Sequence, residues 1–136
     1  MKVQLDDGAK MSERAHKWDA GLDLFARETR TVPARGAAVF NTGVHVEIPE
    51  GYGGMLVSKS GLNVLRGITS EGLIDSGYTG AICVKLYNSG DADYTVETGD
   101  KISQLVIIPV MTAPLELVDA LDESERGNNG FGSSGK

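Results

Sequence analysis

The chain has 136 residues, and its 13 lysines and arginines against 19 aspartates and glutamates give a formal net charge of −6. Hydrophobic residues make up 40% of the chain and charged residues 24%, proportions that are typical of a folded globular domain and exclude wholesale disorder. The length predicts one domain. The acidic balance argues against stable binding to nucleic acid, which depends on lysine and arginine at the phosphates.

We expect neither a membrane span nor secretion. The longest apolar run, Leu105 to Met111, is far shorter than the roughly 18 residues that a span needs. The N-terminal residues lack an apolar signal core. The single cysteine, Cys83, cannot form an intramolecular disulfide, which is typical of a reducing compartment. These features predict a cytoplasmic protein.

Short strands between turn residues are the expected elements. The segment 44–48 alternates apolar and polar residues and stops at a Pro-Glu-Gly turn. In chain order we expect strands at 44–48, 81–87, 94–97, 102–110 and 115–118, with one short helix at 60–65. The segment 102–110 is nearly continuously apolar, which predicts a strand buried on both faces. With 18 glycines and almost no helical periodicity, the chain is predicted to be all-β, as a closed barrel or a sandwich.

The last segment differs in composition from the rest. From Asp122 onward, Phe131 is the one large apolar residue among glycines, serines, asparagines and charged residues. Gly130 to Lys136 matches most of the P-loop pattern, but a P-loop opens a helix, and we expect none after Lys136. Two interpretations stay open from the residues alone. The segment is either a frayed terminus or a nest of backbone N–H groups for phosphate oxygens, with Arg126 as a bidentate donor.

Four glycine-flanked polar clusters interrupt the body of the chain. They are Ala20–Leu24 around Asp23, Ser58–Gly61 with Lys59, Gly72–Gly80 with Asp75 and Tyr78 in an expected hairpin, and Gly99–Leu105 with Gln104. Taken singly, each admits a purely structural role: a turn residue for Asp23, a helix cap for Ser60, a core aromatic for Tyr78 and an outward strand position for Gln104.

Taken together and in this order, the four clusters and the tail resemble the five motifs of the trimeric all-β dUTPases, the deoxyuridine 5′-triphosphate nucleotidohydrolases. The resemblance runs from about residue 20 to residue 136, and its most specific parts lie at 72–80 and 126–135. It implies a distorted jelly-roll or β-barrel-like fold. It also implies a β domain over residues 1–125 and a flexible arm over 126–136 that closes over the active site.

The implied activity is hydrolysis of dUTP to dUMP and pyrophosphate by attack of water on the α-phosphate, which limits uracil in DNA and supplies dUMP for dTMP synthesis. Asp75 would orient and deprotonate the water, and Tyr78 would pack under the deoxyribose and exclude a 2′-hydroxyl. The other implied substrate-binding residues are Thr69, Gly72 and Ile74 for uracil, Lys59, Ser60, Gly61 and Gln104 for the phosphates, and Arg126, Phe131, Gly132, Ser133 and Ser134 in the arm.

The implied cofactor is Mg²⁺, with Asp23 acting on it through water. A triphosphate that enters a protein of net charge −6 beside Asp23 and Asp75 meets repulsion that a divalent cation offsets. His16 and His45 lack metal-ligand spacing and Cys83 stands alone, so zinc is not expected. The resemblance further implies a homotrimer with shared active sites, in the cytoplasm of a bacterium or of a host infected by a virus or phage.

Two positions depart from the family pattern, and two alternative functions share the fold. Lys59 stands where many members carry arginine, which keeps the charge and loses the planar fork. Gly77 stands where a second acidic residue is common, so that Asp75 is the only carboxylate of its motif. A dCTP deaminase shares the fold, but its catalytic glutamate corresponds to Lys85 here, and deamination is not expected. A non-catalytic regulator is the second alternative, which we treat as a second role only, because the proposed catalytic groups are present.

Overall fold

The structure, a computed structural model, describes residues 1–130, which form ten strands and one short helix. In chain order these are β1 (Lys2–Leu5), β2 (Gly21–Phe25), β3 (Arg30–Val32), β4 (Ala37–Asn41), β5 (Val44–Glu47), β6 (Tyr52–Val57), α1 (Ser60–Arg66), β7 (Ile68–Ile74), β8 (Cys83–Asn88), β9 (Tyr94–Val96) and β10 (Lys101–Pro109). The predicted all-β class is therefore confirmed.

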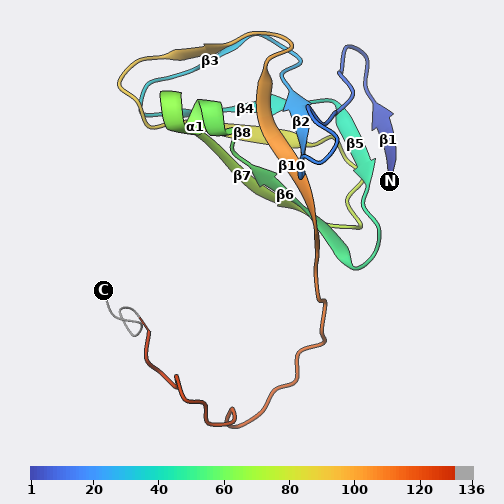
Figure 1. Ribbon diagram of the computed structural model, residues 1–136, viewed down its shortest axis with the longest axis vertical. Helices are drawn as coiled ribbons and strands as arrows, with labels where there is room; N and C mark the ends of the chain where they lie inside the picture. Colours follow the sequence, from blue (N-terminus) through green and yellow to red (C-terminus); the bar gives the residue numbers. More distant parts are fainter. Residues whose placement is uncertain (131–136) are drawn as a thin grey trace.

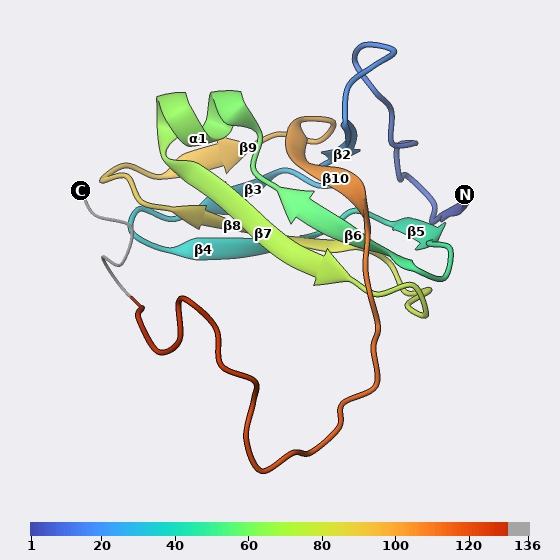
Figure 2. The same ribbon diagram turned by 60° about the horizontal axis from the view of Figure 1, so that its bottom comes forward.

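A six-stranded antiparallel sheet with the order β2-β10-β6-β7-β8-β4 forms most of the body. It curls as a half-barrel, and two small sheets, β1-β5 and β3-β9, complete the jelly-roll-like fold (Figures 1 and 2). The helix α1 lies at one end of β6 and β7, which it connects. It ends at Gly67, whose left-handed φ of 65° lets its N–H reach back to the last turn. No helix among residues 1–130 is long and apolar enough to cross a membrane.

Alternation along the strands decides which side chains enter the core. On β8, Val84 and Leu86 are fully buried while Cys83, Lys85 and Tyr87 are exposed, as the sequence predicts. The core continues across both sides of the half-barrel, with Phe40, Ile68, Ile82, Ile102 and Leu105 among its fully buried members.

The strand β10 begins and ends one residue earlier than predicted, and it is less buried than predicted. Its first half is buried at Ile102, Ser103 and Leu105, but Val106 to Ile108 are only half-buried. A register shift between Lys101 and Ser103 marks a bulge in its pairing with β2. One face of the second half of β10 therefore stays partly open in a single chain.

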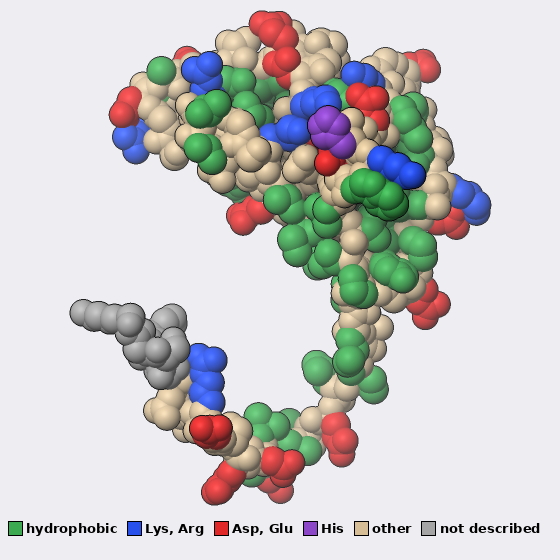
Figure 3. Space-filling view, viewed as in Figure 1, with side chains coloured by type: hydrophobic (Ala, Val, Ile, Leu, Met, Phe, Trp, Pro, Cys, Tyr) green, Lys and Arg blue, Asp and Glu red, His purple; other side chains and the backbone are tan. Residues whose placement is uncertain are grey.

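The strand predicted at 115–118 is wrong. Residues 110–130 contain no regular secondary structure and curve away from the body as an extended arm (Figure 1). Leu115 and Leu117 are fully exposed there, because no strand of the described chain lies beside them. Hydrophobic side chains gather at the base of this arm and continue along it (Figure 3).

Candidate functional site

A buried carboxylate lies at the centre of the first group of site residues. Asp23 is on β2, opposite Gln104 of β10, and its side chain is only 2% exposed. The ammonium of Lys59 lies 2.6 Å from Asp23 Oδ1, and the ammonium of Lys101 lies 2.7 Å from Oδ2. Gln104 donates from Nε2 to Oδ1 over 3.4 Å. We call Asp23, Lys59, Lys101 and Gln104 the lysine–aspartate cluster.

The cluster keeps Asp23 ionised. Burial of the carboxyl acts to raise the pKa of Asp23, but the ammonium groups of Lys101 and Lys59 and the amide of Gln104 outweigh burial and hold this pKa below its ordinary value. Among residues 1–130, Lys101 approaches Oδ2 as an ion pair without the angle of a hydrogen bond. The carboxylate also raises the pKa of Lys101. At neutral pH the cluster carries two positive charges and one negative charge.

Small residues and hydroxyl groups hold the cluster in place. A Cβ on Gly21 would lie 2.9 Å from Cβ of Gln104, so only glycine leaves room for the glutamine side chain on this face of β2. Ser58, which precedes Lys59, accepts from the backbone N–H of Ser70 at 2.9 Å and donates to the backbone carbonyl of Ser70 at 3.0 Å. The hydroxyls of Ser70 and Ser103 lie 2.8 Å apart in the core below. The end of β6 that delivers Lys59 is thereby fixed to β7 and β10.

Ser60 and Gly61 follow at the exposed start of α1. A Cβ placed on Gly61 would meet no described atom within 4 Å, so the backbone is open to close approach. Thr69 lies on the same side of the molecule, where it lines a cavity of about 430 Å³ with Ser58, Ser70, Glu71 and Tyr87. The structure therefore brings Thr69 close to Ser58, which directly precedes the expected phosphate-binding residue Lys59.

Asp75 and Tyr78 lie in the loop between β7 and β8, residues 75–82, which we call the Asp75 loop. Asp75 is exposed and lines a cavity of about 260 Å³ with Gly53, Leu73 and Ser76 among others. Its carbonyl accepts from the N–H of Tyr78 at 3.0 Å, and the Tyr78 hydroxyl donates to the Ala81 carbonyl at 3.0 Å. A Cβ on Gly80 would overlap the outer end of the Tyr78 ring, so a larger residue there would displace this exposed side chain. The predicted hairpin over 72–80 is wrong, because residues 72–74 pair with β6 and the residues that follow form a loop, which these contacts shape.

The other expected uracil-binding residues lie on β7. Gly72 is exposed opposite Leu56, and Ile74 is half-buried opposite Gly54. β8 pairs with β7 only from Ile68 to Ser70. Backbone groups of 71–74 on that edge are therefore without a strand partner in the described chain.

The structure does not bring the lysine–aspartate cluster and the Asp75 loop together within one chain. Gln104 lies opposite Val57, whereas Asp75 follows Ile74, which lies opposite Gly54 at the other end of β6. Four residues along a strand separate the two rows by roughly 13 Å, and two strand spacings add about 10 Å across the sheet. Arg126 is also apart from both groups: it lies in the arm, where its Nε donates to Asn129 O at 3.1 Å. Phe131, Gly132, Ser133 and Ser134 lie outside the described residues.

The donor set tests which kind of metal the site fits. No group of three or more His, Cys, Asp or Glu side chains among residues 1–130 is arranged to hold a metal ion. Asp23 is the one buried carboxylate beside the expected phosphate site. A single carboxylate suits a hydrated Mg²⁺ that arrives with phosphates and keeps its waters, and it does not suit a protein-built cage.

Sequence reasoning missed Lys101. A signal was present, because a lone aspartate between apolar residues of a strand needs cationic partners if it is buried. Lys101 opens the strand that carries Gln104, three residues before it. The register of β10 against β2, which the sequence does not reveal, decides that it faces Asp23.

The fold and the cluster define an all-β protein with a positively charged site suited to an anionic ligand. The dUTPase family model matches residues 7–135. The chain is 41% identical over 140 residues to the deoxyuridine 5′-triphosphate nucleotidohydrolase of Clostridium tetani, covering 100% of this chain and 97% of that protein. It is 36% identical to the enzyme of the same name from Kluyveromyces lactis, covering 100% and 94%. A structure of the Staphylococcus bacteriophage 80alpha dUTPase with dUPNHPP superposes with a TM-score of 0.89 at 36% identity, covering 99% and 98% of the two chains. The chain belongs to the dUTPase family.

Proposed function

We propose that this protein hydrolyses dUTP to dUMP and pyrophosphate, with Asp75 as the base. In this reaction a water oxygen attacks the α-phosphorus, the bond to the bridging oxygen of the pyrophosphate breaks, and the carboxylate of Asp75 accepts a proton from the water. The observation that carries the proposal is the exposed carboxylate of Asp75, held by the same turn as Tyr78, in a chain of this family.

The remaining roles follow from the placement of each residue. Gly72 and Ile74 lie where the free edge of β7 offers backbone donors and acceptors to the edge of uracil. The aromatic ring of Tyr78 would cover the deoxyribose. On the phosphate side, Lys59, Ser60, Gly61 and Gln104 would contact phosphate oxygens. Thr69, which we expect to contact uracil, lies in the paired part of β7 and lines the cavity beside Ser58.

Asp23 would hold Mg²⁺ through a water molecule. When bound to the triphosphate, Mg²⁺ neutralises the charge that develops on the pyrophosphate leaving group. The dUTPase of Staphylococcus aureus phage phi11 coordinates a structural Mg(II) ion. In this chain the lysine–aspartate cluster keeps Asp23 charged, which is the state that a hydrated cation requires.

A homotrimer with shared active sites accounts for the separation of the two groups. The α-phosphorus must lie next to Asp75 and within reach of Lys59 and Gln104, and one chain holds these residues at opposite ends of β6. Apposition of one chain's Asp75 loop and another chain's cluster removes the conflict. The arm supports association, because Leu115, Leu117 and Leu121 are 101%, 100% and 88% exposed in the single chain. We assign residues 126–136 as the segment that closes over the substrate and residues 1–125 as the β domain.

One further observation favours this function over deamination. Lys85 is exposed on β8 with its ammonium 4.8 Å from the ring centre of Tyr87, so this strand presents a cation where a deaminase needs a carboxylate. Cys83 is a free, exposed thiol, which suits the reducing cytoplasm in which we expect the enzyme to act.

A turnover assay separates the candidate functions. The purified protein is incubated with Mg²⁺ and either dUTP or dCTP, and pyrophosphate and ammonia are measured. We expect pyrophosphate from dUTP and no ammonia from dCTP. Ammonia from dCTP would establish a deaminase, and tight binding of dUTP without turnover would establish a regulator.

A further inference from the structure

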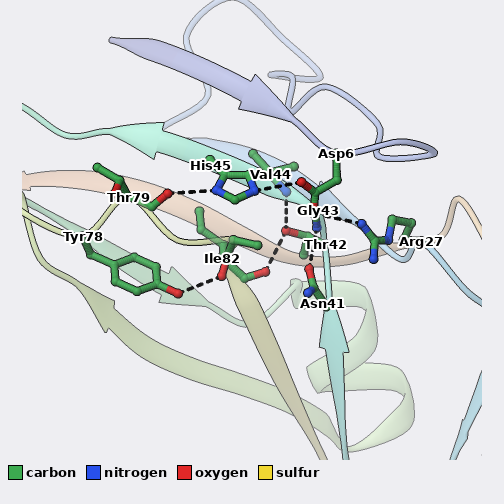
Figure 4. A network of polar contacts seen from close by, with 11 residues as sticks. Asp6, Arg27, Asn41, Thr42, Gly43, Val44, His45, Tyr78, Thr79 and Ile82 are labelled. Atoms are coloured by element: carbon green, nitrogen blue, oxygen red, sulfur yellow. Dashed lines mark hydrogen bonds and ion pairs between the residues drawn. The ribbon is translucent and has the colours of Figure 1, made fainter.

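A histidine outside the site described above contacts the Asp75 loop. His45 lies on β5 between Asp6, just after β1, and Thr79 of the loop (Figure 4). Its Nδ1 lies 2.8 Å from the carbonyl oxygen of Thr79, and its Nε2 lies 3.1 Å from Oδ1 of Asp6. Within residues 1–130, two side chains from outside the loop hydrogen-bond its backbone: Thr42 donates from Oγ1 to the carbonyl of Ile82 at the end of the loop, and His45 contacts the carbonyl of Thr79 in its middle.

The two contacts fix the protonation state of the ring. A carbonyl oxygen only accepts hydrogen bonds, and so does an ionised carboxylate. The other carboxyl oxygen of Asp6, Oδ2, accepts from the guanidinium of Arg27 at 3.1 Å. A neutral imidazole has one N–H group and can satisfy only one of these acceptors. Both bonds form together only when His45 carries a proton on each nitrogen and is an imidazolium.

The charges around the ring agree with that state. Asp6 faces the ring from the segment after β1, and Arg27 lies behind Asp6, two residues after the end of β2. Lys2 and Glu47 line the same cavity and pair with each other at 2.8 Å, so they largely cancel. The loop carbonyl that accepts from Nδ1, and then the carboxylate of Asp6, raise the pKa of His45 above its ordinary value.

We propose that His45, as an imidazolium bridged between Asp6 and the Thr79 carbonyl, is a positioning residue that holds the Asp75 loop in its substrate-binding form. The contact lies one residue from Tyr78, and it is formed by a side chain of a different strand. The opposite end of the loop is tied separately, because Ile82 exchanges backbone hydrogen bonds with Thr42 and Val44. A neutral His45 has one N–H group and keeps only one of its two bonds, so loss of a proton breaks the bridge between Asp6 and the middle of the loop, whereas the end of the loop stays attached through Ile82. This inference rests on the roles proposed above for Asp75 and Tyr78.

The sign of the pH effect follows from the raised pKa. A histidine whose folded-state pKa lies above its unfolded value stabilises the folded loop fully at pH values below 6.5 and loses that effect as the pH rises through the folded-state pKa. We therefore expect affinity for a uridine nucleotide to fall over that range.

The test measures the charge of the ring and binding of a non-hydrolysable dUTP analogue, dUPNHPP, in the full chain. Nitrogen-15 NMR of the ring at about pH 6 is expected to show both nitrogens of His45 protonated. His45→Gln keeps one donor and removes the charge, and we expect it to weaken binding of the analogue roughly threefold to tenfold at about pH 6. The ratio of its Kd to that of the native protein is expected to approach one at high pH, where the native histidine is neutral as well. Taking this ratio cancels the ionisation of the nucleotide.

Two further variants sharpen the result. His16→Gln, at the other histidine, is the matched control and is expected to bind as the native protein does at every pH. Asp6→Asn keeps the ring and removes its anionic partner, so the pH at which affinity falls is expected to move down. A single protonated nitrogen on His45 at about pH 6, or a Kd ratio that does not change with pH, would overturn the proposal. Absence of dUTP hydrolysis would overturn the proposed function alone, because neither readout uses turnover.

Discussion

The separation of Asp75 from the lysine–aspartate cluster predicts that two inactive variants restore activity when they assemble together. Asp75→Asn removes the base and is expected to lower kcat by about 10²-fold or more. Lys59→Met combined with Gln104→Met removes phosphate contacts and leaves Lys101 paired with Asp23, so the cluster retains one ion pair. Each variant alone is expected to be nearly inactive.

The size of the recovery follows from counting interfaces. In a closed ring each site takes the Asp75 loop from one chain and the cluster from the next. Equal mixing gives each of these two chains an even chance of carrying the intact part. About a quarter of the sites are then intact, so we expect about a quarter of the native activity.

The assay unfolds the two variants together in urea, refolds the mixture and measures pyrophosphate release from dUTP. Native mass spectrometry of differently tagged chains confirms that mixed oligomers have formed and gives the number of chains. The matched control mixes native protein with a chain that carries all three substitutions. Shared sites predict about a quarter of native activity in this mixture too, whereas sites within one chain predict about a half.

Two outcomes would refute the reasoning. No recovery in verified mixed oligomers would mean that Asp75 and the cluster must belong to one chain. Half of the native activity in the control mixture would lead to the same conclusion. Either result would require the Asp75 loop or the end of β6 to move by more than 10 Å on binding, given the register of β7 and β10 against β6.

Three more predictions test individual residues. Tyr78→Ala is expected to narrow the preference for dUTP over UTP, because the ring excludes the 2′-hydroxyl. An unchanged ratio of kcat/KM for the two nucleotides would mean that another group excludes the 2′-hydroxyl. Deleting residues 126–136 is expected to leave Tm almost unchanged and to abolish most turnover. The single substitution Phe131→Ala is expected to cost about 1–3 kcal/mol of substrate binding, which is the range for base–aromatic stacking. Full activity of the truncated chain would mean that the segment is a frayed terminus. Asp23→Asn is expected to lower the free energy of unfolding by about 2–4 kcal/mol at neutral pH, since two ammonium groups lose a carboxylate. Because the pKa of Asp23 is lowered in the folded state, this difference is full above the ordinary value of 3.8 and shrinks as the pH falls through the folded-state pKa. A pH-independent difference in urea unfolding would contradict the cluster's role.

Local patterns in the sequence predicted the elements that local physics decides. The alternation at 81–87 predicts β8, whose buried Val84 and Leu86 match it residue by residue. The short helix is found at Ser60–Arg66, and its glycine stop is visible in the sequence. The motifs at 72–80 and 126–135 are specific enough to place the chain in its family.

Strands whose pattern depends on neighbours were missed. β6 carries Gly53 and Gly54, which weaken any strand propensity, yet a Cβ on Gly54 would lie 2.7 Å from Leu105 Cδ1 and 2.8 Å from Ile48 Cδ1. The glycine is explained by close packing between strands, which no local window contains. The apolar run at 115–118 predicts a strand, but an apolar pattern does not identify a strand with which the segment could pair, and none lies beside it in the described chain.

Contacts between distant residues were also beyond sequence reasoning. Lys101 meets Asp23 through the register of β10 on β2, and His45 meets Thr79 and Asp6 across 34 and 39 residues. Neither histidine shows a spacing that suggests a ligand set, so His45 carried no signal for its contact with the Asp75 loop.

The lysine at position 59 fits the way in which the cluster divides one carboxylate between two cations. An arginine fork tends to occupy both oxygens of a carboxylate at once. Lys59 contacts only the Oδ1 atom of Asp23, so the Oδ2 atom is free to pair with Lys101. Each ammonium has three donors and uses only part of them on Asp23, so each retains donors for a phosphate oxygen. The side chains of Lys59, Lys101 and Asp23 together carry a net charge of +1 within a chain of net charge −6. That local sign favours a triphosphate at the position where the overall charge of the protein opposes it.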